Sequence, residues 1–79
     1  NLDVEVYPNP VKNVLNIELK DFNDRKYSLY GLFGELIQEN ILENRVTKVD
    51  VQGINPGIYF LTIRNEQGGM IYQNKIVIE

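Results

Sequence analysis

Side chains that could perform covalent chemistry are scarce in this sequence. It contains no histidine and no cysteine, so the commonest general base, the thiol nucleophile and the usual zinc ligands are all missing. The aliphatic hydroxyl groups belong to Ser28, Thr47 and Thr62, and no histidine is present to activate any of them. We therefore expect a protein that is not an enzyme and has no catalytic residue.

Acidic side chains suggest two other kinds of chemistry. Glu35 and Glu39 frame one predicted strand as a potential acid–base pair, and Asp21, Asn23 and Asp24 could offer oxygen ligands to Ca²⁺. That loop lacks the Asp-x-Asp-x-Asp-Gly order and the distal bidentate glutamate of a calcium loop. Solvated acids in turns and on sheet edges, where they suppress edge pairing, explain both groups more simply. We expect neither a metal nor any other cofactor.

The five tyrosines could form an aromatic platform on which sugar rings stack. Tyr59 lies in a continuous apolar run and is predicted to belong to the core, so Tyr30 and Tyr72 are the exposed candidates. Without tryptophan such a platform would be thin. These residues keep open an alternative hypothesis, in which the chain is an accessory glycan-binding or structural β-sandwich module of an extracellular enzyme.

The charge balance excludes several classes of partner. Eight basic and eleven acidic residues give a net charge of -3, and the basic residues form no cluster. Nucleic acid and anionic membrane surfaces are therefore not expected to bind. No apolar run reaches the roughly 18 to 20 residues that a membrane-spanning helix needs, so we expect no direct membrane insertion.

The elements that must position these side chains are strands. Nine Ile, eight Val, eight Leu and five Tyr, with no Ala, favour strand over helix. Short alternating or apolar runs predict strands at 4–7, 13–20, 26–30, 35–39 and 49–51. The run 58–64 is apolar on both faces, which predicts a central strand covered on both sides, and 70–78 is predicted to pair back against it. About seven short strands, with turns every 8 to 12 residues, predict an all-β, immunoglobulin-like antiparallel sandwich. The 79 residues are expected to form a single domain, 1–79.

The same alternation predicts the core and one special turn. The residues expected to be buried are Leu15, Ile17, Val49, Tyr59, Leu61 and Ile63, with Ile37 also facing inward. Gly57 follows Pro56 in an Asn-Pro-Gly turn and is expected to have a positive φ, which glycine adopts without steric cost.

Four segments resemble one family in order and spacing. They are Tyr7-Pro8-Asn9-Pro10, the block from Tyr27 to Gln38 around Gly34, the segment Ile54 to Tyr59 containing Gly57, and the terminal Lys75-Ile76-Val77-Ile78. Together they resemble the C-terminal sorting domain of the type IX secretion system, and the resemblance covers essentially the whole chain. The family motif residues are Pro8, Asn9, Pro10, Gly34, Gly57 and Tyr59.

The resemblance implies a function in protein export. Such a domain is recognised by the outer-membrane secretion machinery, carries the N-terminal cargo domain of the same precursor across the outer membrane, and is then usually removed by a sortase. The implied location is the periplasm in transit and afterwards the cell surface or the extracellular space. We expect translocon recognition at Lys75, Ile76, Val77, Ile78 and Glu79, because a last strand can be paired along its edge or gripped by its tail.

Overall fold

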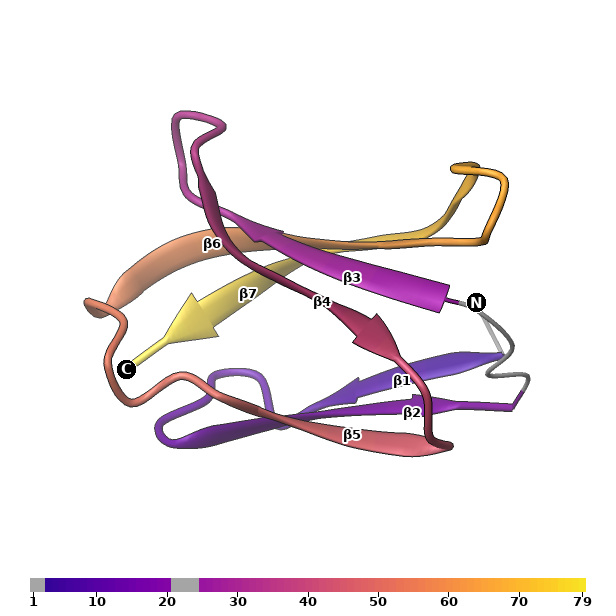
Figure 1. The fold of residues 1–79 in the computed structure, drawn as a ribbon. Coiled ribbons are helices and arrows are strands. Elements are labelled where there is room, and N and C mark those ends of the chain that lie inside the picture. Colours follow the sequence, from indigo (N-terminus) through magenta and orange to yellow (C-terminus); the bar gives the residue numbers. More distant parts are fainter. Residues whose placement is uncertain (1–2, 21–24) are drawn as a thin grey trace.

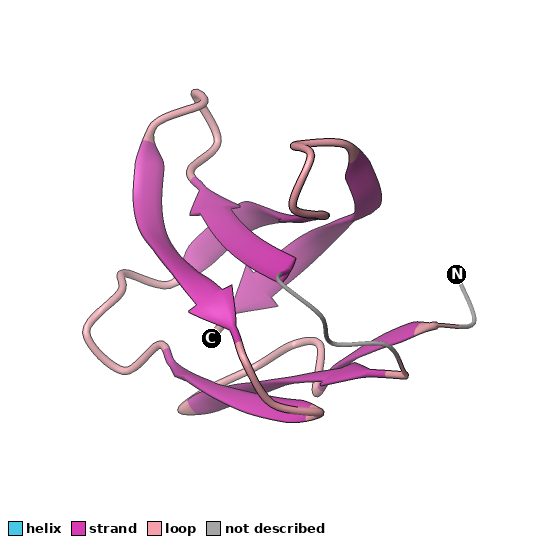
Figure 2. Cartoon of the chain, turned by 45° about the vertical axis from the view of Figure 1, so that its right-hand side comes forward, coloured by secondary structure: helices cyan, strands magenta, loops and turns pink. Residues whose placement is uncertain are grey.

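The computed structural model describes residues 3–20 and 25–79, and every regular element in that part of the chain is a strand. The strands are β1 (Val4–Tyr7), β2 (Val14–Leu19), β3 (Arg25–Tyr30), β4 (Leu36–Leu42), β5 (Val46–Asp50), β6 (Gly57–Arg64) and β7 (Met70–Ile78). They form two facing antiparallel sheets, ordered β1-β2-β5 and β4-β3-β6-β7 (Figure 1). The predicted all-β, seven-stranded sandwich is confirmed, and a second view shows only strands joined by loops (Figure 2).

The core fills the space between the two sheets. Five of the six residues predicted to be buried are buried, and the sixth, Tyr59, is half-buried and packs against the core cluster from its edge. The alternation identified the inward face of β2, where buried side chains alternate along the strand. On the central strand β6, Leu61, Thr62 and Ile63 are all buried, so both faces are covered there. The core also includes residues that no prediction named: Val4, Val11, Leu19, Tyr27, Leu29, Leu42, Val51, Ile76 and Ile78.

The prediction for Ile37 is wrong. Gln38 pairs with Leu29, a buried residue of β3, so Ile37 points to the outer face of the sheet and is exposed. The register shifts by one residue between Leu29 and Tyr30, and such a shift moves side chains to the opposite face. β4 also continues to Leu42, and β5 begins at Val46, so both strands are longer than the weak pattern in that segment indicated, and the chain crosses there from the larger sheet to the smaller one.

The two outer strands of the larger sheet have some of their edge groups occupied. The Asn40 side-chain oxygen accepts the backbone N–H of Ile41 at 2.8 Å on β4, and the Asn74 oxygen accepts that of Lys75 at 2.9 Å on β7. An occupied N–H cannot pair with a strand from another molecule, so these asparagines restrict pairing along both edges.

The turn between β3 and β4 depends on glycine. The N–H of Gly34 donates to the Gly31 carbonyl at 3.0 Å, that of Gly31 donates to the Glu35 carbonyl at 2.8 Å, and Gly34 has φ 87°. A side chain at Gly34 would have free space, so only the backbone conformation disfavours one.

We predict that Gly34→Ala lowers the free energy of unfolding by about 1 kcal/mol, because an L-residue is strained at this φ. The measurement is the urea midpoint. Gly53→Ala is the matched control: position 53 also has free space but no positive φ, and the expected change is within about 0.5 kcal/mol. Equal midpoints for the two variants would contradict the strained conformation.

Candidate functional site

The Pro-Asn-Pro box lies against the end of the last strand. The Asn9 side chain donates its Nδ2–H to the Lys75 carbonyl at 2.8 Å and accepts the Val77 N–H on Oδ1 at 3.0 Å. One amide side chain thus forms both hydrogen bonds that a neighbouring backbone would form. Asn9 extends the larger sheet at its β7 edge.

Val11 continues this pairing with its backbone. Its N–H donates to the Val77 carbonyl at 2.8 Å, and its carbonyl accepts the Glu79 N–H at 2.8 Å. Val11 forms a parallel bridge with Ile78, and its side chain is fully buried. We call residues 9–11 and their four hydrogen bonds to residues 75–79 the clasp.

The sequence explains why a side chain has to take part. Pro8 and Pro10 carry no N–H, so the segment between β1 and Val11 is poor in backbone donors. β1 therefore ends at Tyr7, and the chain passes from the smaller sheet to the edge of the larger one. Asparagine between the prolines supplies the donor and the acceptor that the backbone of this segment does not bring to β7.

The predicted tail residues divide into two groups. Ile76 and Ile78 are buried in the core, whereas Lys75 and Glu79 are exposed and Val77 is half-buried on the outer face. The clasp uses the backbone groups of Lys75, Val77 and Glu79 along the outer edge of β7. A strand from a partner could pair with this end of β7 only after displacing residues 9–11.

Three tyrosine hydroxyls tie the fold together locally. The Tyr7 hydroxyl donates to the Glu18 carboxylate at 3.0 Å on the neighbouring strand, and this hydrogen bond raises the pKa of Tyr7. The Tyr27 hydroxyl donates to Gln38 Oε1 at 2.9 Å, and burial raises the pKa of Tyr27. The Tyr59 hydroxyl donates to the Asn55 carbonyl at 2.6 Å and so braces the Asn-Pro-Gly turn.

The other motif glycine behaves as predicted. Gly57 has φ 155°, a positive value, at the first residue of β6. A Cβ there would meet only ordinary contact with the Tyr59 ring, 3.8 Å away. The requirement for glycine at this position is therefore conformational, not steric.

The residues considered for sugar binding are not assembled into a platform. Tyr30 and Tyr72 are each half-buried, and Tyr72 packs against the core. The Tyr72 hydroxyl accepts a hydrogen bond from Asn74 Nδ2 at 3.0 Å. These positions give the glycan-binding alternative little structural support.

The residues considered for catalysis or metal binding do not converge. Ser28 is buried and donates to the Glu39 carboxylate at 3.1 Å, and that carboxylate also pairs with Lys26 Nζ at 3.3 Å. Glu35 instead accepts the N–H of Phe33 in the β3–β4 turn. Within residues 3–20 and 25–79 no group of three or more acidic side chains could hold a metal ion. The predicted loop ligands Asp21, Asn23 and Asp24 lie outside the described residues.

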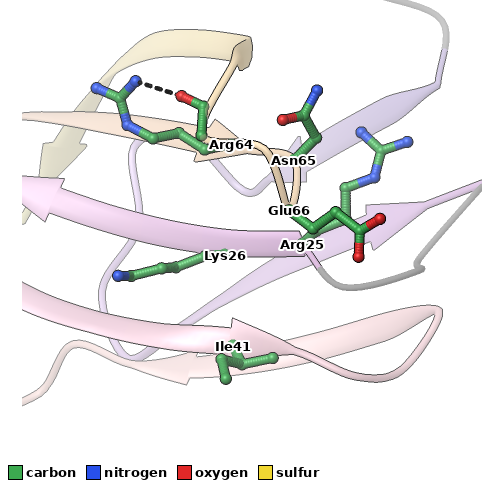
Figure 3. Close-up of a pocket in the computed structure, with 7 residues that line it drawn as sticks. Arg25, Lys26, Ile41, Arg64, Asn65 and Glu66 are labelled. Atoms are coloured by element: carbon green, nitrogen blue, oxygen red, sulfur yellow. Dashed lines mark hydrogen bonds between the residues drawn. The ribbon is translucent and has the colours of Figure 1, made fainter.

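One hollow of about 300 Å³ lies where β3, β4 and the β6–β7 hairpin meet (Figure 3). Arg64 donates to the Gly68 carbonyl at 3.3 Å, so its guanidinium is already engaged. Lys26 and Arg64 extend away from Arg25 and Glu66 in the close-up (Figure 3). With a carboxylate in its wall and its cations directed apart, the hollow offers no converging site for an anion. The described part of the chain contains no helix long and apolar enough to cross a membrane.

The clasp is the feature that sequence reasoning missed. Asn9 was identified as a motif residue, but its partners lie 66 and 68 residues further along the chain. The Pro-Asn-Pro segment is the signal in the sequence for such a contact. Its two prolines have no backbone N–H, so the asparagine amide is the group that can donate to a distant strand.

We predict that Asn9→Asp destabilises the protein at neutral pH by about 1 to 2 kcal/mol, because a carboxylate cannot donate to the Lys75 carbonyl. Protonation below about pH 4 restores an O–H donor, so the stability difference from the wild type should shrink as the pH falls. Urea midpoints between pH 3 and pH 7 measure this.

Asn44→Asp, the same change in an exposed loop, is the control for the general effect of an added carboxyl group. It should show no comparable recovery at low pH. If Asn9→Asp showed a deficit that does not depend on pH, donation by the Asn9 amide would not be the stabilising contact.

Comparisons with known proteins give a family match and one relative. Residues 5–79 match the family described as the secretion system C-terminal sorting domain. The chain is also 31% identical, over 77 residues, to the beta-agarase D of Zobellia galactanivorans; the alignment covers 96% of this chain and 15% of that protein. The chain thus spans about one seventh of the length of this relative, and the family match includes both halves of the clasp. The chain belongs to the family of C-terminal sorting domains of the type IX secretion system.

Proposed function

We propose that this chain exports an N-terminal cargo protein across the outer membrane by binding the type IX translocon, and that a sortase then removes it. Transit through the periplasm and final release at the cell surface or outside the cell belong to the same proposal. The observation that supports it is the family match over residues 5–79, which includes every strand except the first residue of β1. The relative is a much longer protein that includes a region matching this chain, as expected of a sorting domain joined to cargo.

The structure favours one form of tail recognition over another. The edge of β7 at residues 75–79 is occupied by the clasp, and Ile76 and Ile78 face the core. The groups left for a partner are the side chains of Lys75, Val77 and Glu79 on the outside. We propose that the translocon reads these side chains and does not add a strand to this edge.

Folding contributes to the signal in this proposal. The outer face of the tail exists only when β7 is paired with β6 on one side and with the clasp on the other. Of the motif residues, Asn9 bonds β7 directly, and Gly57 and Tyr59 pair with Ile78 and Ile76 of β7. They are proposed to support the recognised surface, while the exposed tail side chains contact the partner.

We predict that residues 1–79, fused behind a periplasm-directed reporter in a host with a type IX system, carry the reporter out of the cell. Lys75→Ala should reduce the secreted fraction severalfold, because it removes the one cation of the tail without touching the core. Lys48→Ala, which changes an exposed lysine on β5, should leave secretion unchanged. Immunoblots of periplasm and medium measure both, and loss of the domain's mass from secreted reporter measures sortase removal.

A substitution is preferable to deletion of residues 75–79. Deletion would remove Ile76 and Ile78 from the core, each contributing about 1.5 to 3 kcal/mol, so an unfolded domain would resemble a lost signal. Retention of the intact fusion in the periplasm would contradict the export function. Full secretion of Lys75→Ala would contradict reading of the Lys75 side chain.

A further inference from the structure

Four exposed hydrophobic side chains gather at one end of the sandwich. Leu32 and Phe33 lie in the β3–β4 turn, Ile37 lies on β4, and Ile58 lies at the start of β6. All four line one hollow of about 340 Å³, together with Gly31, Glu35, Asn55, Gly57 and Tyr59. We call these four side chains the distal patch, because the β3–β4 turn and the β5–β6 loop lie at the opposite end from the start of β1 (Figure 1).

The turn holds Phe33 in the solvent. Its side chain is 91% exposed, and Leu32 beside it is 57% exposed. Three hydrogen bonds close the turn: Gly31 N–H to the Glu35 carbonyl, Gly34 N–H to the Gly31 carbonyl, and Phe33 N–H to Glu35 Oε1 at 3.1 Å. An aromatic ring on a preorganised turn loses little conformational freedom on binding, which is how aromatic anchors act at protein interfaces.

Glycine at position 31 is part of this construction. A Cβ at Gly31 would collide with the carboxyl group of Glu35, which lies against the turn and bonds the Phe33 N–H. The local sequence Gly-Leu-Phe-Gly-Glu therefore brings two apolar side chains outward while its polar groups bond one another. The Phe33 side chain therefore does not pack against its own domain.

The lining indicates the chemistry of the partner. Glu35 is the one charged residue among the described residues of this hollow, and the remaining side chains are mostly apolar. A complementary surface would offer an apolar pocket for Phe33 and a basic side chain near Glu35. A lipid surface fits less well, because the net charge of -3 and a carboxylate in the patch oppose anionic headgroups.

The position of the patch indicates which partner can reach it. Cargo joins the chain before β1, at the far end of a molecule 30 Å long (Figure 1). The patch instead adjoins the tail, since Ile58 pairs with Val77 and Gly57 with Ile78. The exposed tail side chains and the distal patch therefore form one continuous surface at the end away from the cargo.

We infer that the distal patch is a docking surface for a protein of the outer-membrane secretion machinery that presents an apolar pocket with a basic rim. This inference rests on the proposed function and extends it from the tail to the β3–β4 turn. Phe33 is the anchor, Leu32, Ile37 and Ile58 surround it, and Glu35 meets the basic group.

The test measures binding of fluorescently labelled protein to outer-membrane vesicles, opened so that their periplasmic face is accessible, from a host with a type IX system and from an isogenic strain lacking the translocon. The wild type should bind only the first kind of vesicle. Phe33→Ser should weaken that binding at least tenfold, because the ring is lost from the pocket. Ile41→Ser is the control: Ile41 is an exposed apolar residue of β4, 57% exposed like Leu32, but it lies outside the patch, so this variant should bind as the wild type does.

The possible results separate the two proposals. Wild-type binding that needs the translocon, with Phe33→Ser binding equally well, would overturn the docking surface and leave the export function standing. Equal binding of the wild type to both kinds of vesicle would overturn both. Sedimentation that shows a dimer dissociated by Phe33→Ser would assign the patch to a second copy of this chain and overturn the inference. Unchanged urea midpoints of both variants establish that the comparison concerns folded protein.

Discussion

The pairing of the first motif with the last strand is the contact on which the arrangement of this protein depends. β1 belongs to the smaller sheet, yet four residues after its end Val11 is hydrogen-bonded to β7 of the larger one. The two sheets are thus joined along one side by the chain itself, with Asn9 supplying the bonds that its proline neighbours cannot. On the other side the chain also crosses directly, from β4 to β5, and a 3.4 Å hydrogen bond from Gln38 on β4 to the Asp50 carbonyl on β5 adds to that link.

This arrangement explains why a small chain without disulfides can keep a long C-terminal strand in place. The edge of a sheet normally presents unpaired groups that invite another chain. Here the clasp pairs with the end of β7. Asn40 also occupies one N–H group on β4, and Asn74 occupies one on β7. With fewer unpaired edge groups, nonspecific pairing with strands of other molecules is reduced, which favours recognition through one specific surface.

The sequence predicts the strands well where alternation is simple and the strand is paired on both sides. Ile17 and Leu61 are buried as their spacing indicates, because β2 and β6 lie inside their sheets. The rule fails on β4, an edge strand with a register shift, where Ile37 faces solvent. The functional surfaces are harder still: the bonds of Asn9 span most of the chain, and the exposure of Phe33 depends on how Glu35 folds over Gly31. Both depend on tertiary geometry that no local pattern contains.

The clasp also has a mechanical consequence. Val11 and Ile78 run in parallel, so a pull on the chain ahead of β1 and an opposing pull on the C-terminus would slide these two segments past each other along their length. Hydrogen bonds loaded in this way share the force and break together, whereas bonds at the end of a hairpin open one at a time. If the domain were pulled at its C-terminus while folded cargo resisted at its N-terminus, the tension would pass through the hydrogen bonds of Asn9 and Val11. The clasp, which completes the fold, then also resists this force.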